Sequence, residues 1–62
     1  MSDFERILLE CRYLLSLNKT CYELSLIFNT NIDTIYSDLT IKLPKLDTIL
    51  YKRVSHVLNK QK

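Results

Sequence analysis

Glycine is absent from this chain of 62 residues, and proline occurs only once, as Pro44. Folds made of β-strands and tight turns depend on both residue types, so their scarcity favours helices joined by short loops. The apolar share of 47% is ordinary for a globular protein and too high for a disordered one. We therefore expect residues 1–62 to form a single domain of the all-α class.

A long apolar run is also missing. No stretch of the chain approaches the roughly 20 residues that a helix needs to cross a bilayer. Residues 1–6, MSDFER, lack the basic flank and the apolar segment of a signal peptide. These features predict a protein without a membrane partner that is located in the cytoplasm.

Reactive side chains are few. Cys11 and Cys21 form no CxxC motif, and His56 is the only histidine, so no spacing typical of a zinc site is present. We expect two reduced thiols in the core and His56 on the surface. The chain has no glycine-rich loop to hold a phosphate group. The sequence therefore predicts no metal, no cofactor and a protein that is not an enzyme.

Apolar residues recur at three- and four-residue spacing in four segments, which is typical of helices that bury one face. We expect these helices over residues 3–17, 20–28 and 32–43 and from residue 47 or 48 onward. Their expected inner rows are Phe4, Ile7, Leu8, Cys11, Leu14 and Leu15, then Cys21, Leu24 and Phe28, then Ile35, Leu39 and Leu43, and finally Leu50, Val54, Val57 and Leu58. The pattern predicts a small four-helix bundle.

Polar residues mark the helix boundaries. Thr20 and Glu23 have the spacing of a capping box, which begins the second helix. Asn29 tolerates the left-handed backbone that closes a helix, and Asn31 is a good N-cap for the third helix. Pro44 disfavours helical geometry in the residue before it, so we expect the third helix to end there.

Residues 20–43 are the most informative segment. Two short helices meet across three residues, and Ser25 supplies the small side chain that the close crossing in a helix-turn-helix requires. In a DNA-binding unit of this kind, the outward residues of the second helix face base edges in the major groove. Here these residues are Asn31, Ile32, Asp33, Tyr36, Ser37 and Thr40. Three consecutive helices of an ordinary bundle are the alternative.

The same segment resembles a known family. Residues 28–40, FNTNIDTIYSDLT, followed by KLP at 42–44, are similar to the stage III sporulation protein D family, which are helix-turn-helix transcriptional regulators of spore-forming bacteria. The positions that match the family's pattern are Lys19, Thr20, Leu24, Phe28, Thr34, Asp38, Leu39, Thr40, Leu43, Pro44, Leu50, Val54 and Leu58, with Ile35 as a conservative variant. The resemblance spans about residues 18–60 and implies binding to double-stranded DNA. The family carries lysine at the positions of Ile32 and Ser37.

Charge is distributed unevenly. Residues 1–41 hold three cations and six anions, whereas residues 42–62 hold six cations and one anion. A basic end suggests an anionic partner, and a merely solubilising lysine-rich end is the alternative. With DNA as the partner, the expected phosphate contacts are Lys19, Thr20, Lys42, Lys45, Lys52 and Arg53.

A second hypothesis is a protein-interaction module on the same fold that does not bind DNA. Leu26, Ile27 and Ile41 stand where the resembling family has charged residues. Exposed apolar clusters commonly mark a partner site, so these residues would serve a protein partner or self-association, together with Ile32 and the acidic Asp33 and Asp38. The alternative is that they pack against the first helix.

Overall fold

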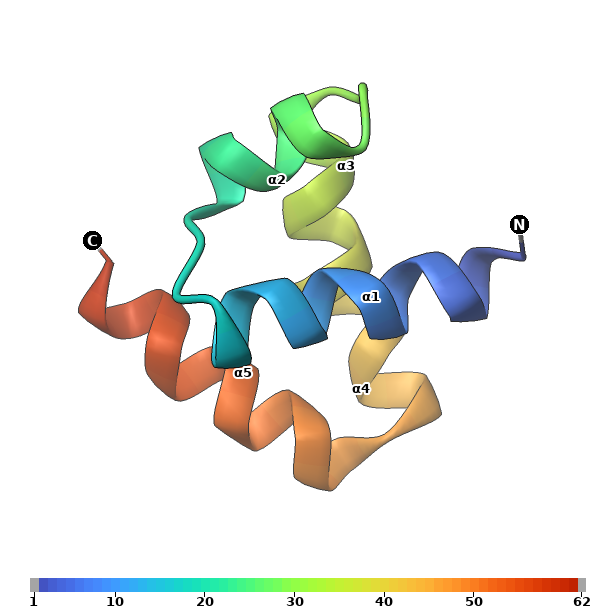
Figure 1. Cartoon of the computed structure of the whole chain (residues 1–62). Helices are drawn as coiled ribbons and strands as arrows, with labels where there is room; N and C mark the ends of the chain where they lie inside the picture. The colour runs from blue at the N-terminus through green and yellow to red at the C-terminus, as the bar shows by residue number, and fades with distance from the viewer. Residues whose placement is uncertain (1, 62) are drawn as a thin grey trace.

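The computed structural model describes residues 2–61, and these residues contain helices and short connections but no strand. The elements are α1 (Asp3–Ser16), α2 (Cys21–Ile27), α3 (Ile32–Ser37), η1 (Asp38–Lys42), α4 (Leu43–Leu46) and α5 (Thr48–Lys60). Because α3, η1 and α4 follow one another without a break, they form one continuous helical rod, and the fold consists of four helical pieces (Figure 1). The predicted small all-α fold is confirmed.

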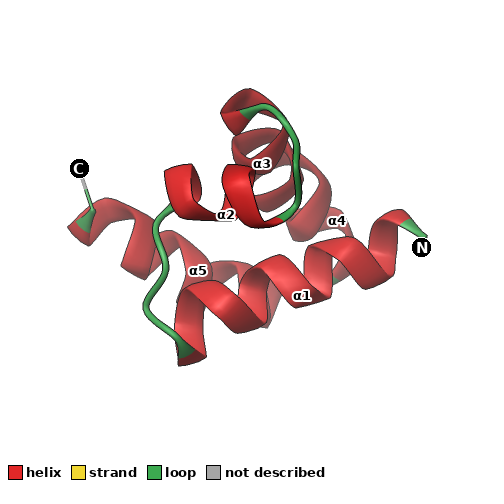
Figure 2. Ribbon diagram, turned by 45° about the horizontal axis from the view of Figure 1, so that its top comes forward, coloured by secondary structure: helices red, strands yellow, loops and turns green. Residues whose placement is uncertain are grey.

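The four pieces pack in two pairs. α1 lies along α5, and α2 lies against α3 (Figure 2). Residues 17–20 join α1 to α2, and residues 28–31 join α2 to α3. The rod from α3 to α4 contacts both pairs, because α3 packs on α2, η1 packs on α1 and α5, and α4 packs on α5. This arrangement leaves one side of the rod open.

Side-chain caps explain where the helices begin. In each case an oxygen of the cap accepts a hydrogen bond from a backbone N–H of the first turn at 2.9 to 3.2 Å, and the capping residues are Ser2, Thr20, Asn31 and Asp47. At Thr20 the capping box is complete, because the Thr20 N–H also donates to the Glu23 carboxylate at 3.0 Å. The sequence-based starts of the second and third helices are therefore confirmed.

The long rod contains a π-helical turn, η1, in which the Leu43 N–H donates to the carbonyl of Asp38. In a regular α-helix the ring of Pro44 would meet the carbonyl of Thr40, and the wider turn moves that carbonyl away. The helix therefore continues through Pro44 to Leu46, and the expectation that Pro44 ends it is wrong. The rod ends instead at Asp47, whose backbone is extended.

The core lies where the four pieces meet. Its buried apolar residues are Ile7, Cys11, Leu14, Cys21, Leu24, Ile35, Leu39, Leu43, Val54 and Leu58, with Leu15, Phe28, Leu50 and Val57 half-buried against them. These positions confirm the predicted inner rows of the second, third and fourth helices. On α1 the prediction is wrong for Phe4 and Leu8, which are 50% and 37% exposed. Glu10 takes an inner position on α1 instead and is fully buried.

Both cysteines belong to this core, as predicted. Cys11 and Cys21 are 2% exposed, and neither forms a disulfide within residues 2–61. Burial raises the pKa of Cys11 to about 12 and also raises the pKa of Cys21. Both thiols are therefore protonated and shielded in the folded chain.

Candidate nucleic-acid interface

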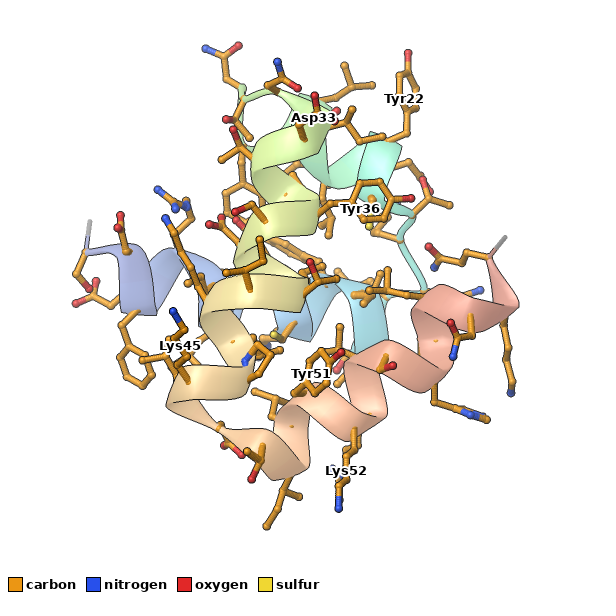
Figure 3. All side chains as sticks on the ribbon, turned by 180° about the vertical axis from the view of Figure 1, so that it is seen from behind. Tyr22, Asp33, Tyr36, Lys45, Tyr51 and Lys52 are labelled. Atoms are coloured by element: carbon orange, nitrogen blue, oxygen red, sulfur yellow. The ribbon has the colours of Figure 1, made fainter. Side chains whose placement is uncertain are left out.

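The rod formed by α3 and η1 has one buried face and one open face. Ile35 and Leu39 on the buried face are 0% exposed, and they hold the rod to the core. Of the six positions expected to meet bases, four are exposed and two are half-buried: Asn31, Asp33, Tyr36 and Thr40 are exposed, whereas Ile32 and Ser37 are half-buried. Ile32 packs against the core. Figure 3 shows Asp33 and Tyr36 projecting from α3 on the side that faces the viewer.

The turn before α3 sets the direction of this helix. Asn29 adopts a left-handed backbone with φ of 51°. The Thr30 N–H donates to the Ser25 carbonyl at 2.9 Å, and the Asn29 N–H donates to the Leu26 carbonyl at 3.3 Å. This pair of hydrogen bonds is a Schellman motif, formed here without glycine. Ser25 itself is 7% exposed, which confirms the prediction of a buried small residue on α2.

A buried ion pair joins the rod to α1 at the start of η1. The Arg6 guanidinium on α1 donates to both carboxylate oxygens of Asp38, at 3.0 Å in each case. Asp38 is 0% exposed, so the expectation that it contributes an acidic surface is wrong. Burial favours the neutral form of Asp38, but hydrogen bonds from Arg6 and Glu10 outweigh it and hold the pKa of Asp38 below its ordinary value. The only exposed acid on the predicted base-reading helix is therefore Asp33.

Glu10 completes this cluster. Its side chain is fully buried, its Oε2 atom lies 3.4 Å from Arg6 Nε, and neither of its oxygens accepts a hydrogen bond from residues 2–61. Burial, together with the hydrogen bond and the charge of Asp38, raises the pKa of Glu10 to about 8. At neutral pH Glu10 is therefore protonated, whereas Asp38 is ionised. Among the described residues, no group of acids, histidines and cysteines gathers as a metal site.

Three of the residues expected to contact phosphate are engaged within the protein. Lys19 Nζ lies 3.7 Å from the Glu23 carboxylate, and Lys42 Nζ lies 3.5 Å from Asp38. The Thr20 side chain accepts the capping hydrogen bond from the backbone, which leaves its hydroxyl proton available. Because the two lysines are partly neutralised, their attraction for an anion is reduced.

The other three expected phosphate contacts are exposed. Lys45, Lys52 and Arg53 form no ion pair with any residue between 2 and 61. Lys45 lies on α4 at one side of the long rod, and Lys52 points away from the rod at the far side of α5 (Figure 3). Arg53 lies near Asp47 and Leu50 at the start of α5. The structure therefore does not gather these three cations into one patch with α3.

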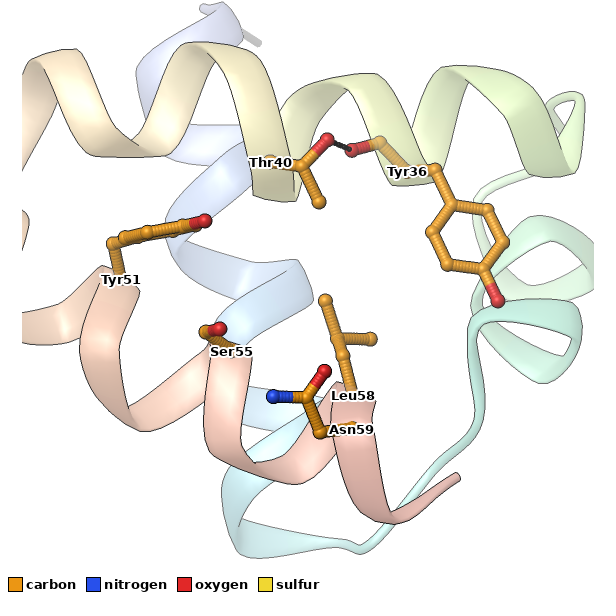
Figure 4. A pocket seen from close by; sticks show the side chains of 6 residues that line it. All are labelled: Tyr36, Thr40, Tyr51, Ser55, Leu58 and Asn59. Carbon is orange, nitrogen blue, oxygen red and sulfur yellow. Dashed lines mark hydrogen bonds between the residues drawn. The ribbon is translucent and has the colours of Figure 1, made fainter. Parts of the chain in front are cut away.

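A groove runs between the rod and α5. It has a volume of about 280 Å³ and is lined by Tyr36, Thr40, Tyr51, Ser55, Leu58 and Asn59 (Figure 4). The Thr40 hydroxyl donates to the Tyr36 carbonyl at 2.6 Å, and the Tyr36 hydroxyl turns toward α2 (Figure 4). Tyr51, Ser55 and Asn59 point into the groove from α5 (Figure 4). Exposed residues of the rod and polar residues of α5 therefore line the same groove.

The apolar residues of the interaction hypothesis are exposed. Leu26 and Ile27 near the end of α2 are 64% and 48% exposed, and Ile41 in η1 is 57% exposed. The alternative, in which they pack against the first helix, is therefore wrong. The three residues belong to two different elements, α2 and η1.

The comparison with known families adds a further finding. Residues 4–62 match the sequence pattern of the family described as Stage III sporulation protein D. The chain belongs to this family. No curated protein and no solved structure matches the chain. The Stage III sporulation protein D family is one of sporulation-related regulators. Within residues 2–61, no helix is both long enough and apolar enough to cross a membrane.

Two features of this family member were missed from the sequence. The polar stripe of Tyr51, Ser55 and Asn59 recurs every four residues on α5, and that spacing alone could have placed these side chains on one helix face. The burial of Glu10 and Asp38 gave no such signal, because it depends on Arg6 approaching from another helix.

Proposed function

We propose that this member of the Stage III sporulation protein D family is a DNA-binding transcriptional regulator that acts in the cytoplasm and catalyses no reaction. Residues 1–62 act as one helix-turn-helix domain whose core is residues 20–43. In this proposal α2 lies across the DNA backbone and α3 enters the major groove, where Asn31, Asp33, Tyr36 and Thr40 meet the base edges. Ile32 and Ser37, which are half-buried, lie at the margin of that contact.

The observation that carries the proposal is the division of the rod into two faces. Ile35 and Leu39 are fully buried, while Asp33, Tyr36 and Thr40 are exposed on the same rod. The turn at Asn29 and the capping by Asn31 hold the start of this rod rigidly, so polar side chains project from a fixed backbone. A helix that reads bases needs both a fixed backbone and exposed polar side chains, because side chains on a mobile helix would not stay aligned with the base edges.

The buried ion pair also supports the proposal. With its charge neutralised by Arg6 inside the protein, Asp38 does not repel DNA phosphates. Asp33 remains exposed in the first turn of α3, where a carboxylate accepts a hydrogen bond from a cytosine amino group in the major groove. Non-specific affinity should be weak, since few cations flank the rod.

The test is titration of a fluorescently labelled random duplex with the purified protein at about 50 mM and about 200 mM salt, between which phosphate contacts lose much of their strength. We expect weak binding at the lower salt and loss of binding at the higher salt. Ser37→Lys adds a cation on the rod and should tighten binding to every duplex. If neither protein binds at the lower salt, the proposed function is wrong.

The second candidate function is a protein-interaction module, which the exposure of Leu26, Ile27 and Ile41 favours. Self-association through these residues predicts a concentration-dependent mass in sedimentation equilibrium. Leu26→Ser should then make the protein monomeric, whereas Ile49→Ser, a matched change at a residue that is 70% exposed on α5, should not. A protein that is monomeric at all concentrations contradicts self-association.

A further inference from the structure

The side chains that line the groove between the rod and α5 have a common chemistry. Hydroxyl and amide groups come from Thr40, Tyr51, Ser55 and Asn59, Leu58 forms an apolar part of the wall, and no carboxylate is among the lining residues (Figure 4). Thr40 already donates its proton to the Tyr36 carbonyl. The Tyr36 hydroxyl turns toward α2 and away from the α5 side of the groove, so the donors available to a ligand come from α5 (Figure 4).

These α5 donors have no side-chain hydrogen-bond partner in the part of the chain that the structure describes. No side-chain hydrogen bond joins Tyr51, Ser55 or Asn59 to any other residue between 2 and 61. The three residues follow one another at a spacing of four, so they form a stripe along one side of α5. A stripe of unpaired neutral donors next to an open helix is suited to an extended acceptor.

We propose that this groove binds the phosphodiester backbone of one DNA strand, with Tyr51, Ser55 and Asn59 as the hydrogen-bond donors; this inference rests on the proposed function. Serine, asparagine and tyrosine are among the side chains that commonly donate to DNA phosphates, and such contacts fix the position of a protein without reading the sequence. At about 280 Å³ the groove is below the usual size of a small-molecule site, roughly 300 to 1,000 Å³.

The dimensions of DNA agree with this role. The major groove is about 12 Å wide, which admits a single helix of about 10 to 12 Å diameter. A second helix packed beside it, at an axial separation of about 8 to 10 Å, then lies at the rim of the groove. The phosphates line this rim. Because α5 packs beside η1 and α4, which continue α3 in the same rod, α5 meets one strand when the rod occupies the groove. Lys45 lies on the opposite side of the rod from Tyr51 and faces the other strand (Figure 3).

The test compares two substitutions that add the same charge to neighbouring positions of α5. Ser55→Asp places a carboxylate in the groove, whereas His56→Asp places one at an exposed position outside the groove lining. Affinity for a random duplex is measured by fluorescence anisotropy at about 50 mM salt, with circular dichroism as the check of folding. We expect Ser55→Asp to weaken binding more than tenfold, and His56→Asp to weaken it only about twofold through the screened field of the added charge.

Tyr51→Phe is the second variant, because it removes only a hydroxyl and leaves the ring in place. Loss of one hydrogen bond to a charged group should weaken binding about tenfold. The slope of log affinity against log salt should not change, since that slope counts cations and the variant removes none. The same loss on every duplex sequence is expected of a phosphate contact.

The outcomes separate this inference from the proposed function. If wild-type protein binds DNA but Tyr51→Phe binds equally well, or if the two Asp variants weaken binding by the same factor, the groove inference is overturned and the proposed function stands. If neither the wild-type protein nor Ser37→Lys binds at the lower salt, both are overturned. Selective weakening by Ser55→Asp and Tyr51→Phe supports the groove as the backbone site.

Discussion

Arg6 on α1 and Asp38 in η1 are joined by two hydrogen bonds of 3.0 Å, from Nε to Oδ2 and from Nη2 to Oδ1. This pairing connects the first helix to the helix that carries the candidate base-contacting residues. The Asp38 side chain is fully buried, with 0% of its surface exposed, whereas the Arg6 side chain is 28% exposed. Two parallel hydrogen bonds between ions fix orientation as well as distance, so α1 sets how the rod is held.

Removing one member of this pair should strongly destabilise the fold. Arg6→Ala leaves two buried carboxyl groups, Asp38 and Glu10, without their shared cation, and we expect a loss of about 3 to 5 kcal/mol in unfolding free energy. Arg12→Ala is the matched control, because Arg12 is exposed on the same helix, and it should change stability by less than about 0.5 kcal/mol. Urea denaturation monitored by circular dichroism measures both. Equal stability of the two variants would contradict the role of the pair.

The raised pKa of Glu10 predicts a pH dependence of stability. The pKa of Glu10 rises from 4.5 to about 8 on folding, so between these values the folded chain holds a proton that the unfolded chain has released. The unfolding free energy should therefore fall as pH rises through this window, by up to about 1.4 kcal/mol per pH unit. Asp38 contributes in the opposite direction, but only below its ordinary pKa of 3.8.

Glu10→Gln isolates this effect, because the amide keeps the shape and a hydrogen-bond donor but does not titrate. In thermal unfolding at pH 5, 6, 7 and 8, the melting temperature of the wild type should decline as pH rises. The melting temperature of the variant should depend less on pH. Glu5→Gln, at an exposed position on the same helix, serves as the control and should retain the wild-type profile. A wild-type profile in Glu10→Gln would mean that Glu10 is not the titrating group.

The crossing of α2 and α3 makes a separate prediction. Ser25 is 7% exposed, and its hydroxyl donates to the Tyr22 carbonyl at 2.6 Å. Ser25→Leu should overpack the crossing and destabilise the fold by about 1 to 3 kcal/mol. Ser16→Leu, at the exposed end of α1, should change it by less than about 0.5 kcal/mol. A melting temperature of Ser25→Leu equal to that of the wild type would show that the two helices do not cross closely at this residue.

Much of the fold follows from local signals in the sequence. The capping box at Thr20, the left-handed Asn29 and the inner row of Ile35, Leu39 and Leu43 were all predictable, because each depends on residues within one or two turns. The continuation through Pro44 was not predictable in this way, since the proline rule applies to a regular α-helix and η1 is a π-turn. The wider turn of η1 relieves the steric clash that Pro44 would cause in a regular α-helix.

The candidate site was predictable only in part. The pattern identified α3 and its exposed polar residues, since helical periodicity fixes the faces of a helix. It gave no information on Asp38, whose burial is stabilised by Arg6 from a distant part of the chain. It also missed the Tyr51 stripe, because the groove exists only after α5 has packed beside the rod. Helical periodicity could not predict these two features, because each depends on contacts between different helices.

Two exposed lysines at different distances from the candidate site, Lys45 and Lys52, give a direct electrostatic prediction. Lys45→Gln should lower the slope of log affinity against log salt by about 0.9, the value for one neutralised phosphate. Lys52→Gln removes the same charge from a side chain that points away from the rod, so its slope should change less (Figure 3). Anisotropy titrations at several salt concentrations give both slopes. Equal changes in the two variants would place the DNA elsewhere on the protein.

The central claim is that DNA binds the open face of α3, and a nuclear magnetic resonance titration tests it most directly. Isotope-labelled protein is mixed with a short duplex at about 50 mM salt, and backbone amide shifts are followed residue by residue. We expect the shifts to concentrate at Asn31, Asp33, Tyr36 and Thr40 and to extend to Ser55 on α5. Shifts confined to Leu26 and Ile27, or no shifts at any residue, would contradict it.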